Sequence, residues 1–174
     1  MEKPLRVKKQ KLNSVICTSA AICNFLQQKD ACSDEALRMF VRETIEKQYS
    51  HKKTEVIEKN INYAMGQAGV SPDFAIKYMK EKFGISLFPV DRKDFEKVDD
   101  GFIVMRASVS KGGLEFGHSL CIRNGYIIDS IESAPEPYLF KGKILGYTTF
   151  NIQYMYTLDQ KLAQKPSYIE IEID

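Results

Sequence analysis

Residues 117–130, with the sequence GHSLCIRNGYIIDS, decide how the second half of this chain folds. Asn124 and Gly125 stand between two apolar runs, and this dipeptide favours a two-residue type I′ turn, in which both central residues need positive φ. The stretch therefore predicts a β-hairpin in which Arg123 faces Tyr126 next to the turn.

This register sorts the side chains of the hairpin between the two faces of a sheet. Counting outward from the turn, Leu120 faces Asp129, so His118, Ile127 and Asp129 project from one side and Cys121 from the other. His118 and Asp129 are then diagonal neighbours roughly 7 Å apart at Cβ, close enough for an imidazole N–H to reach a carboxylate. A slip of one residue would separate them. The register also excludes Cys121 as a thiol partner of His118.

Hydrophobic periodicity predicts helices in the first half of the chain and strands in the second. Helices are expected over 18–28, from an N-cap at Ser33 to about 49, from a cap at Thr54 to about 69, and over 71–84. Strands are expected over 85–88, 101–108, the hairpin, 143–156 and an edge strand at 168–173. This order predicts an α+β fold. We expect one domain over 1–174, with residues 1–12 forming a basic flexible arm.

Composition narrows the classes of function. The net charge is +2, with 44% hydrophobic and 28% charged residues, which is ordinary for a globular domain. No apolar run is long enough for a membrane span and no signal-peptide pattern opens the chain, so we expect no membrane partner. A nucleic acid partner is not expected either, because the basic arm has no aromatic residues interleaved with it.

The four cysteines lack the spacing of a disulfide scaffold, and neither histidine stands at zinc-ligand spacing from them. We therefore expect no metal, no cofactor and a reducing, cytoplasmic environment, with a secreted effector lacking a cleavable signal as the alternative.

Cys17 is the candidate nucleophile. It lies just ahead of the expected helix over 18–28, which is apolar almost all round, and a helix N-terminus lowers the pKa of a thiol. Cys23 lies in the middle of the same helix, and Cys32 stands beside carboxylates that disfavour a thiolate. Together with His118 and Asp129, Cys17 would complete a Cys-His-Asp triad. The alternative reading is an ordinary buried cysteine and a His–Asp pair that serves stability alone.

A resemblance supports the triad. Residues 17–26, CTSAAICNFL, look like the nucleophile helix of papain-like cysteine peptidases, particularly the compact bacteriocin-processing and viral leader types. Residues 117–129 look like the His strand, turn and Asp of that superfamily, and residues 101–104, GFIV, resemble the preceding strand. The resemblance implies a papain-like fold, in which the nucleophile helix packs on a C-terminal antiparallel sheet. It also implies an oxyanion hole completed by the side-chain amide of Asn13 or Gln10.

The resulting hypothesis is a thiol hydrolase, a cysteine protease or related deamidase, that cleaves a peptide, isopeptide or side-chain amide bond in a protein or peptide. The loop before His118 would contact the substrate through Gly113, Leu114, Phe116 and Gly117, or else simply connect two strands. The alternative function is a catalytically inactive papain-like domain that acts as a protein-binding module.

Overall fold

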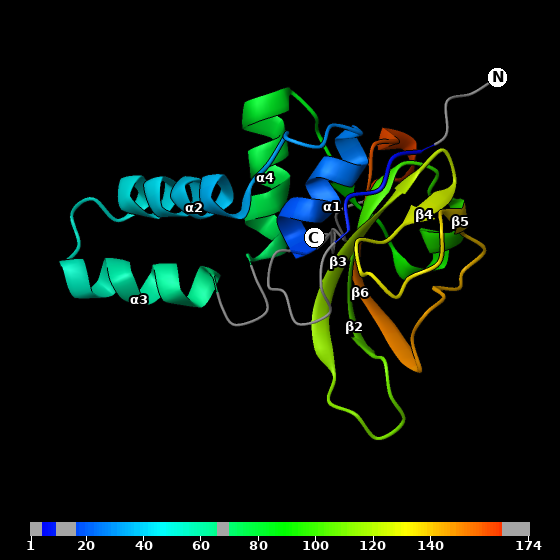
Figure 1. Cartoon of the computed structure of the whole chain (residues 1–174). Coiled ribbons are helices and arrows are strands. Elements are labelled where there is room, and N and C mark those ends of the chain that lie inside the picture. Colours follow the sequence, from blue (N-terminus) through cyan, green and yellow to red (C-terminus); the bar gives the residue numbers. More distant parts are fainter. Residues whose placement is uncertain (1–4, 10–16, 66–69, 165–174) are drawn as a thin grey trace, which may run out of the picture.

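A computed structural model describes residues 5–9, 17–65 and 70–164. In these ranges four α-helices are followed by the six strands of one antiparallel sheet, so the α+β prediction is confirmed (Figure 1). The helices are α1 (Cys17–Leu26), α2 (Asp34–Gln48), α3 (Thr54–Ala64) and α4 (Pro72–Phe83). The strands are β1 (Phe88–Pro89), β2 (Gly101–Ser108), β3 (Phe116–Arg123), β4 (Tyr126–Ile128), β5 (Tyr138–Leu139) and β6 (Thr149–Thr157). Two short 3-10 helices span Arg92–Lys97 and Gln160–Leu162.

Local signals fixed most helix ends. The Ser33 hydroxyl accepts a hydrogen bond from the first turn of α2, and α4 runs from Pro72 to a left-handed Gly84 with φ of 68°, as predicted. The predicted cap at Thr54 is wrong, because Thr54 is the first residue of α3 and Lys53 occupies the cap position without a side-chain bond. The predicted end of this helix near residue 69 lies outside the described residues.

Two predicted strands have different bounds. The N–H of Ile85 donates to the carbonyl of Met79, so this segment completes the exit from α4 and β1 starts only at Phe88. Residues 143–148 form a loop in which the N–H of Leu145 donates to the Tyr138 hydroxyl, and β6 begins after it. The predicted edge strand at 168–173 lies outside the described residues.

The sheet has the strand order β1-β6-β2-β3-β4-β5. In its central hairpin Arg123 pairs with Tyr126 and Cys121 with Ile128, across a turn in which Asn124 and Gly125 have φ of 53° and 82°. The predicted register of the hairpin is therefore confirmed. β4 ends at Ile128, so β3 extends past it, and among the described residues β4 does not pair with the first half of β3.

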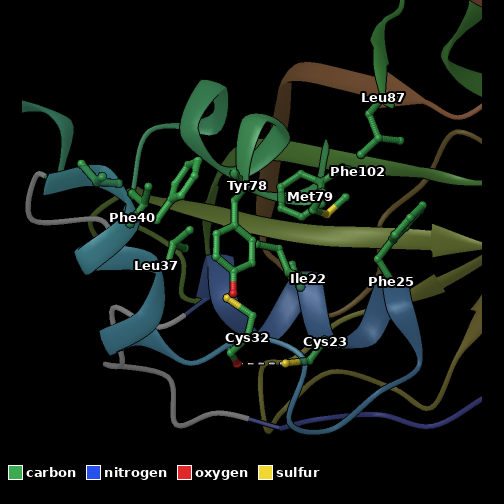
Figure 2. Packing of buried hydrophobic residues seen from close by; sticks show 14 of the residues in the cluster. Ile22, Cys23, Phe25, Cys32, Leu37, Phe40, Tyr78, Met79, Leu87 and Phe102 are labelled. Atoms are coloured by element: carbon green, nitrogen blue, oxygen red, sulfur yellow. Dashed lines mark hydrogen bonds between the residues drawn. The ribbon is translucent and has the colours of Figure 1, made fainter. Parts of the chain in front are cut away.

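The central strands are buried on both faces, which explains the run of apolar residues in β2. α1 lies on one face with α4 packed against it, and there Ile22, Phe25 and Met79 pack with Phe102 of β2 (Figure 2). The opposite face buries a second cluster, which includes Ile103, Met105, Leu120, Ile122, Ile127 and Phe140. α1 packs mainly along β3, whereas the α2–α3 pair extends away from the sheet (Figure 1). In the parts of the chain described, no helix is both long and apolar enough to cross a membrane.

Candidate active site

Cys17, His118 and Asp129 come together at the part of β3 that β4 leaves uncovered. His118 lies in β3, Asp129 directly follows β4, and Cys17 is the first residue of α1. α1 packs on the face opposite to His118, but its first turn reaches the strand at the uncovered edge, where the backbone N–H of Ser119 and the side chain of His118 hydrogen-bond to the Cys17 sulfur. The thiol therefore meets the histidine beyond the last residue pair of β3 and β4, which joins Cys121 to Ile128.

The histidine and the aspartate form a buried pair. His118 Nε2 lies 2.7 Å from Asp129 Oδ1, and their side chains are 2% and 0% exposed. The N–H of Ile131 also donates to Oδ1 at 3.1 Å, as in an Asx turn. Because His118 Nε2 is hydrogen-bonded to Asp129, its other ring nitrogen, Nδ1, is the one available to the Cys17 thiol. The carboxylate thus fixes both the tautomer and the plane of the ring.

The pKa values of the three groups shift in the directions that suit an ion pair. Burial raises the pKa of the Cys17 thiol, but the hydrogen bond to His118 and its charge outweigh this and hold the pKa below the ordinary value. Burial lowers the pKa of His118, but the hydrogen bonds to Asp129 and Cys17 raise it to about 9. Burial raises the pKa of Asp129, and the bonds from His118, Tyr147 and Ile131 more than reverse that effect. Both shifts favour a thiolate beside an imidazolium over a thiol beside a neutral imidazole.

Tyr147 is a member of this site that the sequence analysis missed. Its hydroxyl donates to Asp129 Oδ2 at 2.5 Å, so both carboxylate oxygens have donors. Burial and the adjacent Asp129 charge raise the pKa of Tyr147, which keeps its hydroxyl a donor. Nothing in the sequence marks it, because it is one of nine tyrosines and belongs to a loop between β5 and β6.

The predicted substrate loop joins β2 to β3 and brings one of its side chains to the triad. The ring of Phe116 lies 6.2 Å from that of His118 and 6.3 Å from that of Tyr147, between centroids. Gly117 pairs with Arg106 inside the sheet. Gly113 closes a turn onto the carbonyl of Ser110, and Leu114 is 93% exposed. Phe116 thus borders the base, while Leu114 lies in solvent on the projecting hairpin.

The other cysteines are surrounded differently. Burial raises the pKa of the Cys121 thiol on the opposite face of β3, and raises that of Cys32 to about 11. The Cys23 thiol donates to the carbonyl of Cys32 at 3.1 Å (Figure 2). Gln10 and Asn13, the candidate oxyanion residues, lie outside the described residues. Within the described ranges no three His, Cys, Asp or Glu residues gather in a way that could hold a metal ion.

No protein-family model and no curated protein matches this chain.

Proposed function

We propose that this protein is a thiol hydrolase of the papain-like type, which cleaves a peptide, isopeptide or side-chain amide bond. The observation that carries the proposal is the hydrogen-bonded series Cys17–His118–Asp129, in which a buried thiol has a lowered pKa. The pKa of a buried cysteine without such a partner is raised instead, as that of Cys121 is.

The chemistry follows from the positions of the groups. The Cys17 sulfur attacks the substrate carbonyl carbon, and His118 gives its proton to the leaving amine, so that an acyl-thioester remains. Water then attacks the thioester while His118 accepts its proton, and Cys17 leaves as the thiolate. The tetrahedral oxyanion is held by the N–H groups at the start of α1, joined by Asn13 or Gln10.

Three features support the papain-like assignment. The nucleophile begins a buried helix, the base lies on a later strand of an antiparallel sheet, and the acid follows the next turn of the chain. The resemblance of residues 17–26 and 117–129 to that superfamily points the same way.

The proposal is tested by incubating the purified protein with three probes: a ubiquitin-derived electrophilic warhead, a peptide library and a glutamine-deamidation substrate. We expect turnover of one substrate class or covalent capture at Cys17. Cys17→Ala and His118→Ala serve as matched controls. Equal signal from both variants and the unmodified protein would refute the assignment.

A second function is favoured by one observation. Cys17 and His118 are each only 3% exposed, which suits a protein-binding module with an inactive site. Mass-spectrometric mapping of iodoacetamide adducts at mildly acidic pH separates the two. A hydrolase alkylates first at Cys17, whereas an inactive domain does not distinguish Cys17 from Cys23.

A further inference from the structure

The arm segment, residues 5–9, lies against the far end of α1 and is held through its backbone. The N–H of Lys8 donates to Asn24 Oδ1 at 2.6 Å, and Asn24 Nδ2 donates back to the carbonyl of Lys8 at 3.3 Å. Arg6 repeats this pattern with Gln27, at 2.7 Å and 3.0 Å. Each side-chain amide therefore uses its donor and its acceptor on one residue of the arm segment.

The spacing of these contacts fits an extended chain on a helix. Arg6 and Lys8 are two residues apart, so their backbone groups face the same way in an extended segment. Asn24 lies in the last turn of α1, and Gln27 directly follows the helix with a left-handed φ of 56°, where its side-chain amide also donates to the carbonyl of Asn24 at 2.6 Å. Asn24 is 2% exposed, so its amide depends on the arm segment for its hydrogen bonds. The arm segment is thus fixed to the helix that carries Cys17.

Lys9, at the end of the arm segment, contacts the loop that follows Asp129. Lys9 Nζ donates to the carbonyls of Ile131 and Ala134, each at 3.3 Å. The N–H of the same Ile131 donates to Asp129 Oδ1 at 3.1 Å. Ile131 therefore accepts a hydrogen bond from Lys9 through its carbonyl and donates one to the Asp129 carboxylate through its N–H.

These hydrogen bonds form a closed series of contacts. It runs from α1 through the arm segment and Lys9 to Ile131, from there to Asp129 and His118, and from His118 back to Cys17 at the start of α1. A closed series of this kind restrains the distance between α1, which carries Cys17, and the loop at Asp129. These two residues are more than 100 positions apart in the sequence.

We propose that Lys9 is a positioning residue, which through the arm segment holds the Asp129 loop against α1 and so keeps His118 oriented toward Cys17. This inference rests on the proposed function, since it assigns a part to that same site. Lys9 touches neither the sulfur nor a substrate. Its effect is transmitted by Ile131 and Asp129, and a misplacement of a catalytic group by about 1 Å can reduce a rate by on the order of 10²-fold.

The test compares three variants of the full chain. Lys9→Met removes the ammonium donors, Lys9→Arg restores donors that can reach both carbonyls, and Lys47→Met removes an exposed lysine of α2 as the matched control. The readout is the rate of iodoacetamide alkylation at Cys17, mapped by mass spectrometry from pH 5 to 9, together with each variant's thermal unfolding midpoint. Alkylation needs no substrate, so it reports the state of the thiol whether or not turnover is found.

We expect Lys9→Met to alkylate about three- to tenfold more slowly at mildly acidic pH, with Lys9→Arg and Lys47→Met close to the unmodified protein. The slowing should persist in 1 M salt, where the Debye length is about 3 Å, because positioning is not screened as a through-space charge effect is. If Lys9→Met is unfolded at the assay temperature, Lys9→Gln replaces it, and the same slowing is expected because the shorter side chain cannot span both carbonyls.

An alkylation rate and pH profile of Lys9→Met equal to those of Lys47→Met would overturn the inference, and so would a slowing that disappears in 1 M salt. The proposed function has a separate test in the same assay. If His118→Ala leaves the reactivity of Cys17 unchanged, the triad itself is wrong. If His118→Ala slows alkylation and Lys9→Met does not, only the positioning role fails.

Discussion

Cys121 belongs to β3 and Cys17 lies beside it at the start of α1, and the surroundings of the two thiols differ more than their burial does. Cys17 is 3% exposed and Cys121 is 0% exposed, yet the pKa of the first is lowered and that of the second is raised. Cys121 has apolar neighbours and a weak contact of 3.9 Å with the carbonyl of Ile128. Cys17 has His118 and the N–H of Ser119. Desolvation acts on both thiols, and a cationic partner reverses its effect on one.

The two faces of β3 bury different kinds of groups. The face with Cys121 packs on α1 and stabilises the fold through burial. The face with His118 buries an ionisable pair, which is costly unless each group is hydrogen-bonded. Tyr147, Ile131 and Cys17 supply the bonds that meet this requirement.

The largest effect is expected from removing the triad. Cys17→Ala and His118→Ala should each abolish turnover, a loss of roughly 10³- to 10⁶-fold, while Asp129→Asn keeps a weak residual activity. Because the groups act as a unit, the Cys17→Ala and His118→Ala double variant should be no worse than either single variant. Cys121→Ala is the control from the opposite face and should retain activity. Steady-state kinetics and circular dichroism check this, and full activity in Cys17→Ala would show that the nucleophile is another residue.

The second prediction concerns the origin of the low pKa. In His118→Ala, alkylation of Cys17 at about pH 6 should slow by about 10- to 100-fold. Its rate should rise only as the pH reaches or passes the ordinary thiol value of about 8.5, because burial still raises the pKa of the thiol. Cys121 should stay unmodified in both proteins until they are denatured. A pH–rate profile of adduct formation measures this, and an unchanged profile would mean that the helix N-terminus alone lowers the pKa.

The pH profile of turnover should differ from that of alkylation. A lowered thiol pKa makes both rates rise on the acidic side, at a pH below the ordinary thiol value. On the basic side His118 loses its proton as the pH passes about 9, so turnover should fall while alkylation of the persisting thiolate does not. A turnover profile that stays flat above pH 10 would contradict the assignment of His118 as the acid for the leaving amine.

A smaller effect is expected from Tyr147→Phe. It leaves Asp129 Oδ2 without its protein donor, at a cost of about 1–2 kcal/mol and a fall in unfolding midpoint of about 2–4 °C per kcal/mol. We also expect kcat to fall several-fold with KM unchanged. Tyr138→Phe is the matched control, because its hydroxyl bonds the N–H of Leu145 and not the carboxylate. Equal kcat in both variants would limit Tyr147 to a role in stability.

The smallest effect is expected at the projecting hairpin. Leu114→Ala combined with Phe116→Ala should raise KM by about 3- to 10-fold through lost apolar contact with substrate, without changing the alkylation rate of Cys17. Leu139→Ala, which removes an exposed leucine of β5, is the control. Unchanged kinetics in the double variant would make the loop a plain connection between β2 and β3.

Much of the fold could be predicted from the sequence because its signals are local. The caps at Ser33 and Gly84 and the bounds of β2 follow from residue types within one turn or one strand. The predicted strand bounds are wrong where contacts with residues distant in the sequence determine the backbone conformation. The segment after Gly84 bonds back to Met79 of α4, and residues 143–148 form a loop held partly by the hydroxyl of Tyr138.

For the candidate site, the sequence by itself determined the pairing of His118 with Asp129, because a type I′ turn fixes the register of a hairpin and the register fixes which side chains share a face. Tertiary structure alone decided which thiol meets the histidine, because that depends on where β4 stops and how α1 crosses the uncovered edge of β3. It also brought in Tyr147 and Lys9, whose contacts with Asp129 and Ile131 span 18 and 122 residues. No local pattern encodes contacts of that separation, since they arise only when packed elements bring distant segments together.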